Sequence, residues 1–142
     1  MSFARIALGA ALACCHFACT GAAGAAEPKA LSCTFASGRA HTFEKGRFKP
    51  TKASPLKMEI ADIDADRQTA ALKGGSAVPV LRVVRAVNAL HFIEIVGEGY
   101  MNITTVYDAE AAGKPMPAVH SRHFGVLGQP VVSHYVGTCT GG

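Results

Sequence analysis

The chain has 142 residues, 49% of them hydrophobic, and a formal net charge of +4. This length and composition suit one domain that can bury a core of its own. The charge is small and scattered, and no basic run is interleaved with aromatic residues, so nucleic acid is not predicted as a partner.

The first 26 residues have the three parts of an export signal. Residues 1–5 are short and basic, residues 6–18 are mostly apolar, and residues 20–26 are small. A signal peptide needs these parts in this order, with small residues before the cleavage point. We expect cleavage before Ala26 or Glu27, which assigns 1–26 to the signal peptide and leaves a single β-domain, 27–142, that is periplasmic or secreted.

Two alternatives for this N-terminal segment stay open. It is near the length of a membrane anchor, although it is rich in glycine and alanine and interrupted by His16. Residues 11–14, Ala-Leu-Ala-Cys, resemble a bacterial lipobox. We therefore expect the membrane to be a partner only if Cys14 is lipidated.

The cysteines divide between the signal and the mature domain. Cys14, Cys15 and Cys19 lie in the signal, which leaves Cys33 and Cys139 near the two ends of the mature chain. Two cysteines in an exported chain predict a disulfide, with a pair of free buried thiols as the alternative. No Cys-x-x-Cys spacing remains after cleavage, so neither a thioredoxin-type redox site nor a zinc ribbon is indicated.

The mature chain consists of short apolar runs separated by Gly, Pro, Asp and Lys. β-branched and aromatic residues dominate these runs, which favours strands over helices. This pattern predicts an all-β fold, a single antiparallel β-barrel or sandwich of about eight strands closed by one terminal disulfide. The strands are expected at 31–35, 39–43, 56–63, 69–72, 78–84, 89–96, 101–107, 118–124 and 131–136.

Three other segments carry particular expectations. The basic stretch 45–57 is interpreted as a solvated loop, and 66–73 is the best helix candidate. Asp62, Asp64 and Asp66 resemble the opening of a calcium loop, but Arg67 and Lys73 stand where such a loop needs Gly and Glu. We therefore interpret the three aspartates as a strand end running into a turn.

The run 89–96 is apolar on both faces. Leu90, Phe92 and Val96 alternate with Ile93 and Ile95, which is typical of a central strand. Glu94 interrupts the first face, so we expect it near a barrel mouth or paired.

The densest polar cluster is His120-Ser121-Arg122-His123, and His134 lies on the next predicted strand. In a strand, Ser121 and His123 point one way and His120, Arg122 and Phe124 the other. The two imidazoles therefore diverge, and a metal site would need a further histidine such as His134, His41 or His91. No Gly-x-Ser-x-Gly motif supports a hydrolytic serine, so no catalytic residue, metal or cofactor is predicted.

Arg122 has two interpretations. Its planar fork of donors suits a carboxylate or phosphate. The interpretation that we favour is an internal ion pair with Glu94 or Asp108, because polar rows on strands need no ligand.

Four segments resemble a group of small exported proteobacterial proteins that have no assigned activity. These segments are 118–123, Phe92-Ile93-Glu94, 104–107 and Gly137-Thr138-Cys139. More loosely, an exported β-domain with one cysteine near each end is similar to periplasmic inhibitors of C-type lysozyme. That similarity implies an antiparallel barrel that inserts a loop into the lysozyme cleft. The Ser-Gly-x-Lys-Tyr-type inhibitory segment is absent, since residues 74–77 lack the Lys and Tyr.

Together these features predict a non-catalytic, monomeric periplasmic binding or interaction module. Its partner would be an unknown protein or a small anionic ligand. The candidate ligand-binding residues are His120, Ser121, Arg122, His123 and His134. The alternatives are a small metal-binding protein or enzyme that uses the His120–His123 patch, and a lysozyme-inhibitor-like protein.

Overall fold

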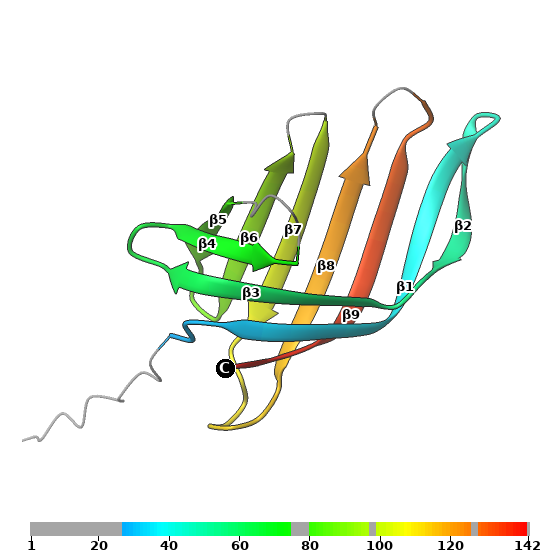
Figure 1. The fold of residues 1–142 in the computed structure, drawn as a ribbon. Helices are drawn as coiled ribbons and strands as arrows, with labels where there is room; N and C mark the ends of the chain where they lie inside the picture. Colours follow the sequence, from blue (N-terminus) through cyan, green and yellow to red (C-terminus); the bar gives the residue numbers. More distant parts are fainter. Residues whose placement is uncertain (1–26, 75–79, 97–98, 126–127, 142) are drawn as a thin grey trace, which may run out of the picture.

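The computed structural model describes residues 27–74, 80–96, 99–125 and 128–141. The predicted signal peptide and Cys14 lie outside the described residues, as do residues 75–77 of the segment compared with the lysozyme inhibitors. All nine strands of the described part are paired antiparallel (Figure 1). They are β1 (Leu31–Glu44), β2 (Arg47–Ala53), β3 (Leu56–Asp64), β4 (Thr69–Lys73), β5 (Val80–Arg85), β6 (Ala89–Val96), β7 (Tyr100–Tyr107), β8 (Met116–Phe124) and β9 (Val131–Gly141).

The strands close into an antiparallel barrel, as predicted. The sheet runs in the order β2-β1-β3-β4-β5-β6-β7-β8-β9, and β9 returns to pair with β1. β1 and β3 to β9 therefore form a closed eight-stranded barrel, with β2 as one extra strand. The described residues contain no helix, and thus none long and apolar enough to cross a membrane.

β1 corrects the prediction of two separate strands divided at Gly38. It is one long strand, whose first half pairs with β3 and whose second half pairs with β2, and it bends visibly along its length (Figure 1). Its pairing with β9 shifts register between Thr34 and Ser37. Gly38 continues the strand rather than breaking it, since it pairs with Ala53 of β2 and Tyr135 of β9. The Tyr135 ring occupies the space that a side chain would need there.

β2 corrects the interpretation of residues 45–57 as a solvated loop. Lys45 and Gly46 both have positive φ, 50° and 80°, which is the conformation of a tight hairpin turn. Across this turn the rings of Phe43 and Phe48 pack 5.1 Å apart. β2 pairs only with β1, and an edge strand tolerates the lysines and Pro50 that made the segment resemble a loop.

Residues 66–73, the best helix candidate, form no helix: residues 65–68 are a turn, and β4 follows where the strand 69–72 was predicted. The Asp64 carboxylate accepts a hydrogen bond from the Arg67 backbone N–H at 2.8 Å, as an aspartate does in a turn. The prediction of an aspartate-rich turn is therefore confirmed.

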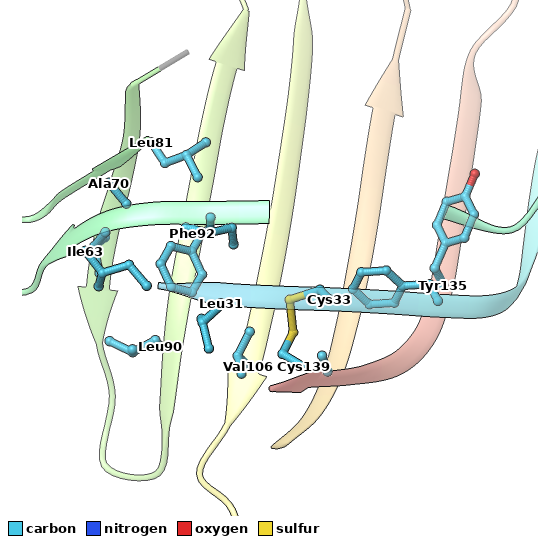
Figure 2. Close-up of a cluster of buried hydrophobic side chains, with 14 of the residues drawn as sticks. Leu31, Cys33, Ile63, Ala70, Leu81, Leu90, Phe92, Val106, Tyr135 and Cys139 are labelled. Carbon is cyan, nitrogen blue, oxygen red and sulfur yellow. A yellow bond between two sulfur atoms is a disulfide. The ribbon is translucent and has the colours of Figure 1, made fainter. Parts of the chain in front are cut away.

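The core fills the barrel interior with buried side chains that come from all nine strands; Figure 2 shows part of this cluster. Phe35, Phe92 and Val83 are among the fully buried side chains. In β6, burial of Leu90 and Phe92 is confirmed, but Ile95 is 76% exposed. The expectation that both faces of this strand are apolar and buried is wrong at Ile95, because none of the described strands packs over the outside of the barrel there.

The predicted disulfide is confirmed. Cys33 and Cys139 lie directly opposite each other on β1 and β9, and their sulfur atoms are bonded across a sequence separation of 106 residues. Both cysteines are buried in the core (Figure 2). The bond therefore fastens the seam where the first and last strands close the barrel.

Candidate functional site

The two faces of β8 separate the predicted site residues. His120 is 3% exposed and faces the barrel interior, and Arg122 faces the same way near the open end. Ser121 and His123 face outward, beside His134 of β9. The alternation predicted from the sequence is thus observed, and the five candidate residues form two groups rather than one site.

The inward group belongs to a row of polar residues that crosses four strands. Glu94, Asn102, Arg122 and Ser133 are successive cross-strand partners from β6 to β9. We call these four residues the inner polar row. Asn102 Nδ2 donates to Glu94 Oε2 at 2.7 Å, which confirms the expectation that Glu94 is paired.

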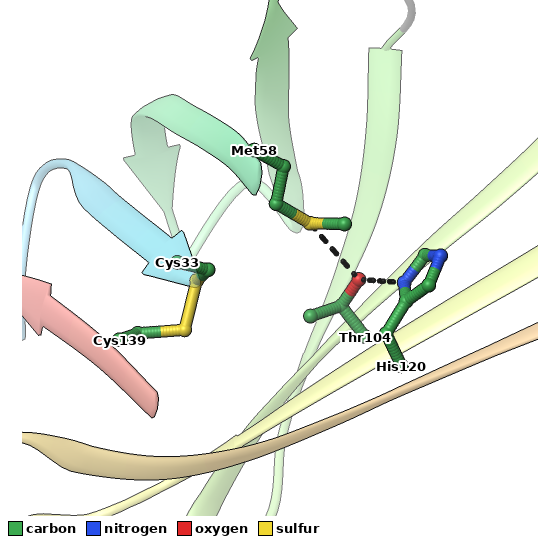
Figure 3. The surroundings of a disulfide bond; sticks show 5 residues. All are labelled: Cys33, Met58, Thr104, His120 and Cys139. Atoms are coloured by element: carbon green, nitrogen blue, oxygen red, sulfur yellow. Dashed lines mark hydrogen bonds between the residues drawn. A yellow bond between two sulfur atoms is a disulfide. The ribbon is translucent and has the colours of Figure 1, made fainter. Parts of the chain in front are cut away.

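Below this row, a chain of hydrogen bonds holds His120. Arg122 Nε donates to His120 Nε2 at 3.1 Å. On the other side of the ring, His120 Nδ1 lies 2.8 Å from Thr104 Oγ1 (Figure 3). Because an arginine can only donate, Nε2 must accept, so the proton of neutral His120 is on Nδ1 and is donated to Thr104. The Thr104 hydroxyl then donates to the Met58 sulfur at 3.6 Å.

This chain requires a neutral imidazole, and the surroundings enforce one. Burial, and then the positive charge of Arg122, lower the pKa of His120 from 6.5 to about 4. His120 is therefore an uncharged acceptor near neutral pH. It fixes the Nε edge of the Arg122 guanidinium while leaving the two Nη groups available.

The favoured prediction of an ion pair between Arg122 and Glu94 or Asp108 is wrong. Glu94 bonds to Asn102, and Asp108, which follows the opposite end of β7, pairs with Arg85 Nη1 at 2.9 Å. Within the described residues, the Arg122 side chain forms no ion pair, and its hydrogen bond is the one to His120. Its guanidinium carbon also lies 5.8 Å from the centre of the Tyr135 ring.

Above His120, Arg122 contributes to a hollow of about 380 Å³ at the open end of the barrel. The rings of Tyr100 and Phe124 lie 4.2 Å apart, tilted by 44°, and form its apolar side with Val131. Arg122, Asn102 and Ser133 form its polar side. We call this hollow the mouth site. An apolar wall with a few convergent polar groups is the usual composition of a small-molecule pocket.

The outward group is more open. Ser121 Oγ hydrogen-bonds His134 Nδ1 at 3.0 Å, and the His123 and His134 rings lie 6.4 Å apart. His91 is engaged elsewhere, 2.9 Å from Thr105 Oγ1. Among the residues placed by the structure, no three histidines, cysteines or carboxylates gather closely enough to hold a metal ion.

Sequence reasoning missed most of the mouth site. The same two-residue alternation that put His120 and Arg122 on one face of their strand could have put Tyr100 and Asn102 on one face of theirs. It could not show that these residues lie beside Arg122, because that depends on the register between strands.

Comparison of the chain with protein-family models, with curated proteins and with solved structures finds no match. The candidate site is therefore interpreted from its own geometry.

Proposed function

We propose that this protein is an exported, non-catalytic binding module whose mouth site takes a small organic anion. The observation that carries the proposal is the state of Arg122. Its guanidinium stands at the mouth of the barrel with one edge fixed by His120 and without a carboxylate partner in the described structure. A cation that is oriented in advance and left unpaired is suited to an incoming anion.

The composition of the mouth site narrows the ligand class. Tyr100 and Phe124 offer aromatic surface on one side, and Arg122 offers a bidentate fork on the other. A carboxylate attached to an aromatic or apolar body matches both sides. Asn102 and Ser133 add neutral hydrogen-bonding groups that help to orient the charged end.

Export is supported by two independent features. The N-terminal sequence has the order of a signal peptide, and the seam disulfide suits an oxidising compartment. A periplasmic or secreted location follows from these features as part of the proposal. The similarity to lysozyme inhibitors supplies no matching inhibitory residues, so a protein partner of that kind has no comparable support.

The metal-protein or enzyme alternative has weaker support. It would combine one histidine of β8 with another histidine, and His123 and His134 do lie 6.4 Å apart, but among the described residues no third histidine, cysteine or carboxylate joins them. The inward histidine is already committed to Arg122 and Thr104.

The test compares a charged probe with its uncharged analogue. Naphthaleneacetate and naphthaleneacetamide have nearly the same shape, and calorimetric titration measures the affinity of each. We expect Arg122→Gln to weaken naphthaleneacetate binding about tenfold or more, because a hydrogen bond to a charged group contributes about 1.5–3 kcal/mol. Binding of the amide should change little.

The matched control is Arg82→Gln, which removes the same charge from an exposed position on β5. It should bind naphthaleneacetate as the wild type does. The proposal fails if the acid does not bind at millimolar concentration, if acid and amide bind the wild type equally, or if Arg82→Gln loses as much affinity as Arg122→Gln.

A further inference from the structure

A second hollow lies on the outer face of the sheet, over β1, β2 and β9. These strands lie side by side in Figure 1. The hollow has a volume of about 590 Å³. Its polar lining includes Arg39, His41, Lys52 and His134. Ser37 and Val136 also contribute, and none of the described residues that line it is acidic. We call it the outer basic hollow.

The strand register concentrates positive charge there. Lys52 of β2 is directly opposite Arg39 of β1, and Arg39 is directly opposite His134 of β9. Like charges directly opposite each other in a sheet are destabilising. The fold thus places two permanent cations together at a cost in stability.

Nothing in the described structure neutralises this pair. Neither Arg39 nor Lys52 forms an ion pair there. The nearest acidic residue of the hairpin, Glu44, is bonded to Lys49 at 2.7 Å. Strand alternation puts both Glu44 and Lys49 on the inner face, away from the hollow.

The chemistry of the lining favours a compact anion with more than one negative charge. Arg39 supplies a bidentate fork and Lys52 a point charge, which together match two charges on one phosphate group. The imidazoles of His41 and His134 and the hydroxyl of Ser37 add hydrogen-bonding groups. Val136 is 61% exposed beside them and offers an apolar contact to whatever carries the phosphate.

We propose that the outer basic hollow binds a phosphate group, carried either by a soluble phosphate compound or by an anionic phospholipid. The hollow and the mouth site use opposite faces of the same sheet, so this site does not depend on the mouth site. Two sources are compatible with the same chemistry, and the experiment separates them.

The experiment uses two probes and two charge-matched double variants. Inorganic pyrophosphate tests the soluble source, and phosphatidylglycerol vesicles, with phosphatidylcholine vesicles as reference, test the lipid source. Arg39→Gln with Lys52→Gln removes two charges from the hollow. Lys73→Gln with Arg82→Gln removes two charges from β4 and β5, outside the hollow.

We expect Arg39→Gln with Lys52→Gln, the hollow variant, to bind about tenfold or more weakly whichever probe the wild type binds, because charged hydrogen bonds are lost. Lys73→Gln with Arg82→Gln, the control variant, should bind that probe as the wild type does. Binding of pyrophosphate identifies a soluble phosphate compound, and binding of phosphatidylglycerol vesicles alone identifies a lipid headgroup. Amide shifts on adding pyrophosphate, or line broadening on adding vesicles, should centre on Arg39, Lys52 and His134. The melting temperature of the hollow variant should be unchanged or higher, because a repulsion is removed.

Four results would overturn the inference. The first is that neither probe binds, and the second is that both double variants weaken binding equally, which would indicate net charge alone. The third is a response centred on Tyr100, Asn102 and Phe124, which would place the probe in the mouth site. The fourth is a melting temperature lowered by several degrees in the hollow variant, which would make the pair structural.

Discussion

At the scale of single residues, the most consequential side chain is His120. It is a titratable group buried in the barrel interior. Its ring accepts a hydrogen bond from the Arg122 guanidinium on one side and donates one to the Thr104 hydroxyl on the other. Each of these interactions requires the neutral form. A second proton would place a positive charge in the interior beside Arg122, which explains why burial and Arg122 both lower the pKa.

Stability should therefore depend on pH through His120. Its pKa is about 4 in the folded protein against an ordinary value of 6.5, so between these values the unfolded chain binds a proton that the folded chain does not. The contribution is fully present above about pH 6.5, falls as the pH drops to about 4, and totals about 3 kcal/mol. Urea unfolding across this range measures it.

Carboxylates titrate in the same range, so variants must isolate the histidine. As the pH is lowered through this range, the free energy of unfolding of His120→Gln should fall less steeply than that of the wild type. His123→Gln, on the outer face, should keep the wild-type slope. Equal slopes for wild type and His120→Gln would contradict the assignment.

At the scale of elements, the hairpin of β1 and β2 determines how the sheet extends beyond the barrel. Its turn places Lys45 in the left-handed region at φ 50°, which costs a lysine more than an asparagine. Along β1, first β3 and then β2 pair in one continuous register. This pairing is interrupted only at the residues of β1 where its pairing with β9 shifts register. β1 therefore serves both the closed barrel and the open extension.

Relief of the turn strain should stabilise the protein. We expect Lys45→Asn to raise the free energy of unfolding by about 0.5–1 kcal/mol, because asparagine tolerates the left-handed conformation that this type of turn requires. Denaturant unfolding measures the change. Lys45→Gln removes the same charge without relieving the strain and should give no gain; an equal gain in both variants would attribute the effect to charge.

At the scale of the whole molecule, closure of the barrel depends on the contact between its first and last strands. β1 and β9 are far apart in sequence, so bringing them together costs chain entropy that only the completed barrel recovers. The disulfide joins them at the seam, across 106 residues. A long covalent loop of this kind restricts the unfolded chain strongly.

Loss of the disulfide should therefore weaken the entire barrel. We expect Cys33→Ala with Cys139→Ala to lower the free energy of unfolding by about 2–5 kcal/mol. Thermal and denaturant unfolding of the oxidised wild type and the double variant measure this difference. Two free thiols in the folded wild type, or equal stability of the two proteins, would contradict the proposed role of the bond.

The sequence by itself determined the local features of this protein. Short runs of β-branched and aromatic residues between turn residues predicted the all-β class, two-residue alternation predicted the opposite faces of His120 and His123, and the positions of Cys33 and Cys139 outside the predicted signal predicted their pairing. These features depend only on neighbouring residues or on the number and position of cysteines, so the sequence alone can predict them. The interruption of an apolar face by Glu94 likewise indicated a paired position.

Only the tertiary structure decided which residues share a site. The basic stretch became β2 because β1 offered it a free edge, and Gly38 continues its strand because β2 and β9 pair with it on both sides. Within the described residues Arg122 forms no ion pair, because the register places Asn102 and Ser133 beside it and Asp108 beyond the opposite end of β7. Strand register and barrel closure bring together residues that are far apart in the chain. A shift of one residue in the register would move every side chain of a strand to its other face, so no local sequence pattern could predict which residues meet.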